Sequence, residues 1–588
     1  MWVWCFFLSI GSLGVTAALA FLVSSSRWWS LFGKRKPRVF NLLLGGAFVA
    51  ALLMFFPIHN GAVFLSVFNA VQVLAAGCEF GVVAEGIGAC DAWLSDAYKT
   101  WAAAVYAVAP LFTFGFVLSF FKNLSARLRY LGVFFRDAYI FSELNEKSLA
   151  LASDIKKNNK RAALVFTDVF DSEGETVYEL IDRAKQLGAI CFKDDVLVAE
   201  LSTHSARKEL LFFTIGEDET ENLNQALKLI ERYRARLKTH LYVFSTGVES
   251  ALLLTEIDKG EIRVRRINEV QSLINRILYE RADSIFGSAW QTADGTKHIS
   301  AVVVGMGRHG TEMVKALAWF GQMDGYRLEI NAFDCDPLMQ EKFTALAPEL
   351  MSPAYNGVVV PGEAQYSITL HPDVSVETAS FAGEIAKLEN ATYVLVALGD
   401  DELNIATAVN LRMYFERMKL HPVIQAIVYN SQQRKALEGV RNYRGQAYDI
   451  AFIGDIESSY AADVILDSEL EAKALARHLK WGKEEEFWTY EYNYRSSMAS
   501  AIHREARILC GIPGADKAEE ELTEEESDII SVLEHRRWNA YMRAEGYVYS
   551  GSKDKASRND LAKMHHDLVQ YAELTAEEQE KDRKVGTS

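Results

Sequence analysis

A glycine-rich turn between a predicted strand and a predicted helix is the feature that most limits how this chain can fold. The segment reads Ala301-Val-Val-Val-Gly305-Met-Gly307-Arg-His-Gly310, and residues 328–334 form a second β-type run that ends in Asp334. In such a unit the glycines let the backbone approach a pyrophosphate, the helix N-terminus faces the phosphates, and the acid accepts hydrogen bonds from a ribose. The pattern predicts a Rossmann-like domain over residues 297–470. This domain either binds NAD or another adenine nucleotide, or has lost its ligand.

Further β-type runs at residues 393–399, 422–429 and 449–453 complete this predicted domain. Asp400 and Asp401 follow the first of these runs, at the strand end where ligands bind in parallel sheets, although they could instead cap the next helix. The candidate cofactor-binding residues are Gly305, Gly307, Arg308, Gly310, Asp334 and Asp400.

The same series of elements occurs once earlier in the chain, which predicts an internal duplication. Its β-type runs are residues 138–141, 162–168, 210–216, 241–245 and 262–267. The run that ends at Gly216 aligns with the run that ends at Gly399. This first copy, residues 137–285, has no glycine in the loop after its first strand, and Glu143 and Glu146 would repel a pyrophosphate. We expect it to be structural or to bind something else, so that only the second copy binds the nucleotide.

The N-terminal part of the chain contains three apolar runs, each about as long as the roughly 20 residues that cross a bilayer. They are residues 2–23, 39–58 and 101–121. Lys and Arg cluster at 27–38 and again at 122–129. Because such clusters mark the cytoplasmic side, the sequence predicts a multi-pass protein of the cell membrane. Its transmembrane domain would be residues 1–125, with the N-terminus outside and residues 122–588 in the cytoplasm.

The connection between the second and third runs leaves several alternatives open. Residues 61–76 are also apolar and could form a fourth span, a re-entrant helix or an interfacial helix. A span, a short helix, a glycine-rich turn and another span outline a pore, but equally a plain extracellular cap, and no Thr-Val-Gly-Tyr-Gly filter is present. Cys78 and Cys90 lie in this connection, where they would form a disulfide or remain two unpaired apolar side chains.

The overall charge excludes one class of partner. The 588 residues carry a formal net charge of −16. Binding to nucleic acids needs patches of Lys and Arg that contact phosphates. We therefore expect no nucleic-acid partner.

The C-terminal residues 525–588 form a small, mainly helical predicted domain that is rich in His, Arg and aromatic side chains. Trp538 and Tyr541 share a helical face with His535, either as a core or as the wall of a pocket. The candidate ligand-binding residues are Arg537, Trp538, Tyr541, Tyr547, Lys563 and His565. His565 and His566 are adjacent, but no Cys or carboxylate spacing completes a metal site, so we expect no metal and no catalytic residues.

Two stretches resemble known families. The run Val-Ala-Leu-Gly-Asp-Asp-Glu-Leu-Asn at residues 396–404 is similar to the RCK (TrkA-N) family, and the likeness covers about 137–470. It implies paired lobes that form a ligand-gated homo-oligomer, for which we expect a tetramer, and that regulate ion transport. Residues 525–586 resemble a RyR domain of the ryanodine-receptor type, through Glu-His-x-Arg-Trp, Glu-Gly-Tyr and Asp-Leu-Val-x-Tyr. This likeness implies a sensor module of nucleotide-dependent conflict or stress systems.

Together these features predict a multi-domain chain: a helical transmembrane domain, two Rossmann-like RCK repeats, a helical and acidic linker at 471–524 and a RyR domain. The expected function is a ligand-gated membrane protein, not an enzyme, in which a small nucleotide and a RyR ligand regulate a channel-like or effector part. The alternatives are a membrane-anchored NAD-binding oxidoreductase and a non-conducting scaffold. No Tyr-x-x-x-Lys motif, nucleophile elbow or Cys-x-x-Cys motif supports the enzyme.

Overall fold

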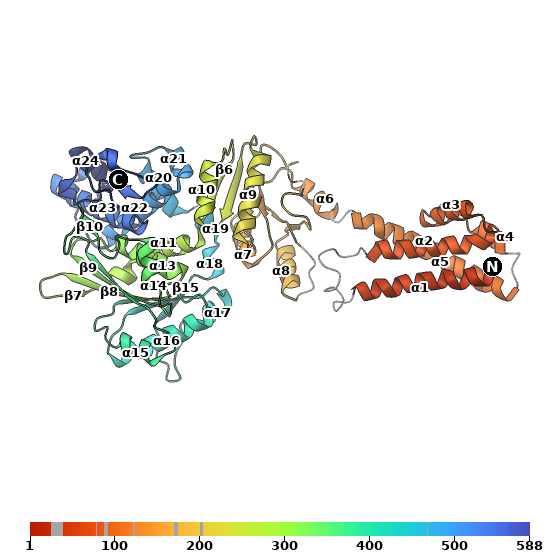
Figure 1. Ribbon diagram of the computed structural model, residues 1–588, viewed down its shortest axis with the longest axis horizontal. Helices are drawn as coiled ribbons and strands as arrows, with labels where there is room; N and C mark the ends of the chain where they lie inside the picture. Colours follow the sequence, from red (N-terminus) through yellow and green to blue (C-terminus); the bar gives the residue numbers. More distant parts are fainter. Residues whose placement is uncertain are drawn as a thin grey trace. The chain divides into compact units, whose positions relative to one another are not determined.

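The computed structural model describes residues 1–24, 39–77, 79–87, 92–120, 124–169, 175–199, 201, 204–466 and 468–587. These residues form two compact units (Figure 1). One contains the N-terminal helices up to Gly132, with residues 175–179. The other contains both large sheets and all later helices.

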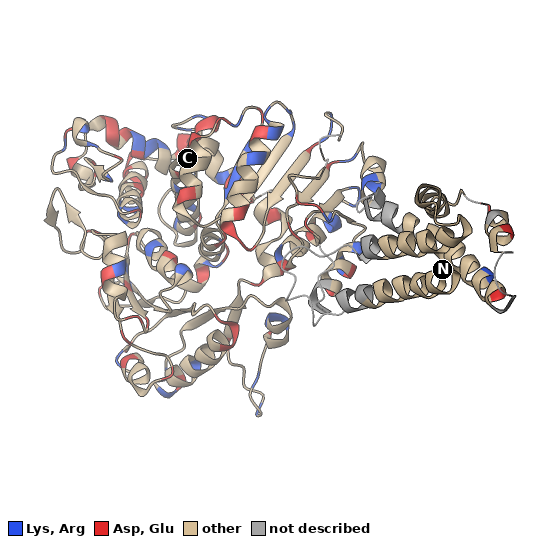
Figure 2. Cartoon of the chain, turned by 45° about the vertical axis from the view of Figure 1, so that its right-hand side comes forward, with Lys and Arg blue, Asp and Glu red and all other residues tan. Residues whose placement is uncertain are grey.

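The N-terminal unit is helical. Its helices are α1 (Trp2–Ser24), α2 (Val39–Ile58), α3 (Val63–Leu74), α4 (Phe80–Gly86), α5 (Ala92–Phe120) and α6 (Leu124–Gly132). Few residues of this unit are coloured as Lys, Arg, Asp or Glu in Figure 2, and α1 and α2 contain no charged residue. The apolar residues pack on one another: Met54, Phe55 and Tyr98 are fully buried in a shared core. Trp101 Nε1 donates to Ser9 Oγ at 2.8 Å, which ties α5 to α1.

The predicted transmembrane domain is contradicted by the structure. Within the described part of the chain, no helix combines the length and the apolar character that a bilayer crossing needs. The predicted multi-pass topology and the placement of residues 122–588 that followed from it are therefore wrong, whereas the membrane as a partner stays a prediction. The prediction took each apolar run as a lipid-facing span. In the structure these helices bury some apolar side chains, such as Met54, in a shared core and expose others, such as Trp4 and Leu111.

Other predictions for this region have different outcomes. Residues 61–76 form the 12-residue helix α3, too short for the roughly 20 residues of a span, which excludes the fourth crossing. Cys78, Cys90 and the basic cluster at 27–38 lie outside the described residues.

The second unit contains two parallel sheets with the same strand order. The first has the order β3-β2-β1-β4-β5-β6. Its strands are β1 (Ala138–Phe141), β2 (Ala163–Phe166), β3 (Ile190–Cys191), β4 (Leu210–Thr214), β5 (Thr239–Phe244) and β6 (Arg263–Ile267). The second has the order β12-β9-β8-β13-β14-β15, with β7 (Trp290–Gln291) antiparallel to β8. Its strands are β8 (Lys297–Val304), β9 (Tyr326–Phe333), β12 (Tyr366–His371), β13 (Tyr393–Val396), β14 (Val423–Ile427) and β15 (Ile450–Ile453).

Both orders are the doubly wound Rossmann order, in which the chain reverses direction beside the first strand. Strands β2, β4 and β13 are buried along their whole length, as expected when helices cover both faces of a parallel sheet. The first repeat has helices α7 (Glu146–Asn158), α8 (Glu175–Gln186), α9 (Glu219–Tyr233), α10 (Val248–Glu256) and α11 (Glu269–Glu280). The second has α12 (Ala282–Phe286), α13 (Arg308–Phe320), α14 (Met339–Leu346), α15 (Ala379–Ile385), α16 (Asp401–Arg417), α17 (Ser431–Leu437), α18 (Ile456–Ser459) and α19 (Ala462–Ile465).

The duplication extends to individual hydrogen bonds. In the second repeat, Leu398 N donates to Asn404 Oδ1 at 2.7 Å, and Asn404 Nδ2 donates to the Ile427 carbonyl at 2.8 Å. In the first, Gly216 N donates to Asn222 Oδ1 at 2.7 Å, and Asn222 Nδ2 donates to the Phe244 carbonyl at 3.0 Å. Each buried Asn thus joins the ends of the fourth and fifth strands.

This equivalence corrects the predicted alignment by one residue. Asp218 and Asp400 are the N-caps of α9 and α16. Gly216 therefore corresponds to Leu398, not to Gly399. The sequence match favoured the two glycines, whereas the helix caps fix the structural register.

The C-terminal helices follow the second sheet. They are α20 (Glu469–His478), α21 (Glu484–Thr489), α22 (Glu491–Leu509), α23 (Glu524–Ala544) and α24 (Ala576–Gly586), with the short strand pair β16 (Val548–Tyr549) and β17 (Met564–His565). Part of the acidic segment forms the first turn of α23, where Thr523 and Glu526 make a capping box and acids favour the helix N-terminus. Helix α23 packs on α13, α22 and α24. Arg543 of α23 also donates to the Ala354 carbonyl at 2.8 Å, which docks this module on the second repeat.

Candidate functional site

The three glycines of the loop before α13 have different local roles. Gly305 has φ +93°, and a Cβ there would lie 2.5 Å from the Ala397 carbonyl oxygen. A Cβ on Gly310 would lie 1.7 Å from the Gly305 carbonyl oxygen, so only glycine lets the helix pack this closely on the strand. A Cβ on Gly307 would meet nothing within 4 Å. The fold thus requires glycine at 305 and 310, whereas Gly307, the N-cap of α13, keeps an approach to the loop backbone open.

The predicted acids lie at the strand ends but differ in their roles. Asp334 Oδ2 accepts from Met306 N at 2.6 Å, and Oδ1 accepts from Asp336 N at 2.8 Å. Each oxygen keeps a second lone pair, so the carboxylate can still accept from a ribose hydroxyl. Asp400 is exposed and caps α16 by accepting from Leu403 N at 2.8 Å, which favours the capping alternative.

The Arg308 side chain contacts the first repeat. Its Nη1 lies 3.3 Å from Glu219 Oε1 and 3.2 Å from Thr246 Oγ1, both in the first repeat. The side chain is largely exposed, so this ion pair adds little to stability. It does place the glycine loop of the second repeat beside the strand ends of the first.

The corresponding loop of the first repeat is filled by its own side chains. Asn145 Oδ1 accepts from Ser148 N at 2.9 Å, and Asn145 Nδ2 donates to the Ile215 carbonyl at 2.8 Å. Burial raises the pKa of Glu143. Burial, with repulsion from neighbouring carboxylates, raises the pKa of Asp168 to about 6. An anionic ligand would bring further negative charge close to Glu143 and Asp168, whose raised pKa values mean that their ionised forms are already disfavoured.

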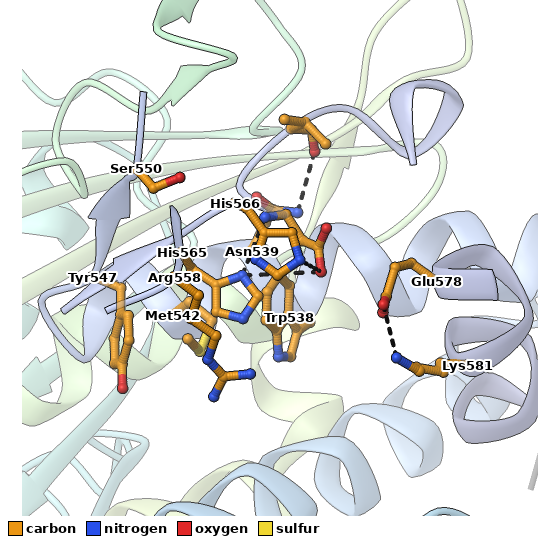
Figure 3. Close-up of polar contacts among 12 residues, drawn as sticks. Trp538, Asn539, Met542, Tyr547, Ser550, Arg558, His565, His566, Glu578 and Lys581 are labelled. Atoms are coloured by element: carbon orange, nitrogen blue, oxygen red, sulfur yellow. Dashed lines mark hydrogen bonds and ion pairs between the residues drawn. The ribbon is translucent and has the colours of Figure 1, made fainter. Parts of the chain in front are cut away.

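A cavity of about 670 Å³ lies in the C-terminal module, among α20, α22, α23, α24 and the segment around β17. Figure 3 shows Trp538, Arg558, His565, His566 and Lys581 gathered there from separate segments. The cations on the cavity wall are Arg477, Lys480, Arg537, Lys555, Arg558, Lys581 and Lys584. The acids are Glu534, Asp567, Glu578 and Asp582.

The structure places three of the six residues predicted for this pocket on the cavity wall: Arg537, Trp538 and His565. The other three do not line it. Tyr541 is buried beneath Arg537, whose guanidinium lies 5.8 Å from the ring. Tyr547 pairs its hydroxyl with Asp560 at 3.4 Å, and Lys563 donates to the Glu545 carbonyl at 2.6 Å.

Sequence reasoning missed the part of the wall that comes from α20 and α22. Arg477, Trp481 and Tyr492 belong to the segment predicted as a linker, yet they line the same cavity. Trp538 Nε1 donates to Tyr492 Oη at 3.4 Å, which joins the two parts of the wall. No local pattern reveals such a partner, because the residues are far apart in the chain.

His565, His566 and Asp567 bring ligand-type atoms within 4.8 Å of one another. The prediction of no metal site overlooked Asp567 as the nearby carboxylate. However, Asp567 N donates to His565 Nδ1 at 3.1 Å, so the proton of a neutral ring lies on Nε2 and neither nitrogen offers a free lone pair. Burial and the nearby Arg558 lower the pKa of His565 to about 3, which keeps the ring neutral. The His565 Nδ1 lone pair is thus engaged by the backbone, and the absence of a metal site stays a prediction.

Comparison with known proteins adds no family to this geometry. No protein-family model and no curated protein matches the chain. The case for a function therefore rests on the glycine loop and on the C-terminal cavity.

Proposed function

We propose that this chain is a ligand-sensing regulator, not an enzyme. The second repeat binds an adenine dinucleotide such as NAD at its glycine loop, and the C-terminal module senses another small molecule. The observation that carries the proposal is the contrast within the loop. Packing requires glycine at 305 and 310, because a Cβ at either position would collide with the backbone. At Gly307 a Cβ would meet nothing, so packing alone does not explain the glycine there.

The RCK and RyR resemblances support this assignment. In the RCK family a ligand at the paired lobes changes the shape of the assembly, and the two repeats here contact each other at their strand ends. The filled loop of the first repeat predicts one dinucleotide per chain.

A network of charged side chains connects the two proposed sites. Arg495 of α22 makes two hydrogen bonds of 2.7 Å to Glu545 at the end of α23, and it lies 3.5 Å from Glu312 of α13. Lys315 of α13 lies 3.7 Å from Glu545. Helix α13 begins at the glycine loop, and α23 carries Arg537 and Trp538. A shift of either helix would therefore move residues of the other site.

The test is the substitution Gly307→Val. The chain should fold normally, because a Cβ meets nothing within 4 Å, but the side chain would occupy the approach to the loop. We expect NAD affinity, measured by calorimetry, to fall by about 100-fold or more, since the phosphates can no longer reach the backbone N–H groups. Gly383→Ala, in α15, is the matched control, because its Cβ also meets nothing. Equal NAD affinity in wild type and Gly307→Val would overturn the proposed site.

A further inference from the structure

Three buried guanidinium groups lie near the carboxylate of Glu534 at the inner end of the C-terminal cavity. Arg477, Arg507, Arg537 and Glu534 are each at most 4% exposed. Glu534 Oε1 accepts from Arg537 Nε at 3.0 Å and Nη2 at 2.8 Å, and from Ser500 Oγ at 2.9 Å. Arg507 Nη2 lies 3.9 Å from Glu534 Oε2. Arg477 Nε donates to Ser500 Oγ at 3.0 Å.

Glu534 is the centre of charge pairing in this arginine cluster. Buried charges are stable only when they are paired, and Glu534 pairs directly with Arg537. Burial lowers the pKa of Arg477 to about 9 against the opposing pull of Glu534, and lowers that of Arg507 to about 10. Although burial alone would raise it, the pKa of Glu534 lies far below its usual range because of the surrounding guanidinium groups. The guanidinium groups therefore keep Glu534 ionised despite its burial.

One donor of the cluster is left for a ligand in the cavity. Arg537 lines the cavity, and its buried Nη1 has no hydrogen-bond acceptor among the described residues. Farther out, the wall carries Lys555 and Arg558, both exposed. Lys555 forms no ion pair with any residue that the structure describes. Among the seven Lys and Arg on the wall, Lys480, Arg558 and Lys584 also form ion pairs with acids that do not line the cavity. Arg537 Nη1 and Lys555 are thus the donors best placed to meet an anion.

We propose that the cavity binds the phosphate or diphosphate group of a small organic molecule, with Arg537 Nη1 as its innermost donor. Planar guanidinium groups match phosphate oxygens, and the volume of about 670 Å³ suits a small-molecule ligand. Trp538 and Trp481 on the wall supply apolar surface for the organic part. This inference rests on the sensing role proposed above and defines the chemical class of the ligand.

The test measures binding of pyrophosphate to the full chain by calorimetry, at constant ionic strength, with chloride as the reference anion. The Gly307→Val background prevents pyrophosphate from binding at the glycine loop. Lys555→Gln with Arg558→Gln removes two exposed cations of the wall, so that the variant should fold. We expect affinity for pyrophosphate to fall about tenfold or more in this double variant.

Lys563→Gln is the matched control. It removes a cation of the same module that sequence reasoning placed in the pocket, but that does not line the cavity. Its affinity for pyrophosphate should equal that of the parent. The inference fails if pyrophosphate binds no more tightly than chloride, or if Lys563→Gln weakens binding while the double variant does not.

The outcomes separate this inference from the proposed dinucleotide site. If the wild-type chain does not bind NAD, or if Gly307→Val binds NAD as tightly as wild type, while pyrophosphate still binds, only the glycine-loop site is refuted. NAD binding without pyrophosphate binding would refute only the phosphate-binding cavity.

Discussion

The two Rossmann-like repeats share a strand order and a buried Asn at the same place, yet they differ in the loop after the first strand. In the second repeat that loop is glycine backbone with an open approach at Gly307. In the first, the Asn145 side chain is hydrogen-bonded to Ser148 N and to the Ile215 carbonyl. The comparison teaches that topology sets where a ligand would bind, whereas the polar side chains of one loop decide whether space remains for it.

The difference also changes what each loop tolerates. A loop closed by side chains can lose one hydrogen bond at moderate cost. A loop closed by contact between backbone atoms has no room for a Cβ at the points of contact, Gly305 and Gly310. The loss of stability caused by substitutions in each repeat should therefore show whether side chains or backbone contacts hold its loop.

The largest effect is expected for Gly310→Val in the second repeat. Its Cβ would lie 1.7 Å from the Gly305 carbonyl oxygen, so α13 must move away from β8. The free energy of unfolding should drop by more than about 4 kcal/mol, among the largest effects of single substitutions. Urea unfolding measures the loss. A Gly310→Val chain as stable as wild type would show that the helix does not pack on the strand as described.

A smaller loss of stability, similar at the two positions, is expected for Asn222→Ala and Asn404→Ala. Each substitution leaves a buried backbone N–H and a carbonyl unpaired, which should cost roughly 2 to 4 kcal/mol. The two losses should agree within about 1 kcal/mol, with any excess at Asn222, because both side chains join the same strand ends and Asn222 Nδ2 also donates to the Gly216 carbonyl at 2.9 Å. Urea midpoints of the two variants give the comparison, and a much larger loss at one position would mean that the repeats are held together differently.

The smallest effect concerns pH in the first repeat. Because burial and neighbouring acids raise the pKa of Asp168 to about 6, the ionised side chain destabilises the folded chain. Its contribution to stability is present below the ordinary carboxyl pKa of 3.8 and is lost as pH rises through 6.

Asp168→Asn should therefore stabilise the chain at about pH 8 by about 1 kcal/mol after solvent screening, and should have no effect near pH 4. Asn also accepts the φ of +57° at this position. Unfolding in urea at the two pH values is the measurement. A gain that persists at low pH would assign the effect to something other than ionisation.

The sequence allowed both sheets to be predicted, because buried parallel strands produce continuous β-branched runs and the glycine loop has a fixed spacing. The roles of Gly305 and Gly310 follow from that spacing as well. The N-terminal domain was wrongly predicted, because an apolar run does not reveal whether its partner is lipid or another helix. Only part of the wall of the C-terminal cavity was predicted. Arg537, Trp538 and His565 are in the motif, but Arg477 comes from a distant helix and no local pattern indicates it.

The arginine cluster has a consequence for the order in which this chain folds. The carbonyl of Val585 accepts from Arg477, 108 residues earlier, and that of Gly586 accepts from Arg507, 79 residues earlier. Contacts between such distant residues form slowly, since a long loop must close first. Until α24 docks, the guanidinium groups remain hydrated and repel one another. The last turn of α24 therefore completes the cavity late in folding, and its release should be the easiest way for the cavity to open.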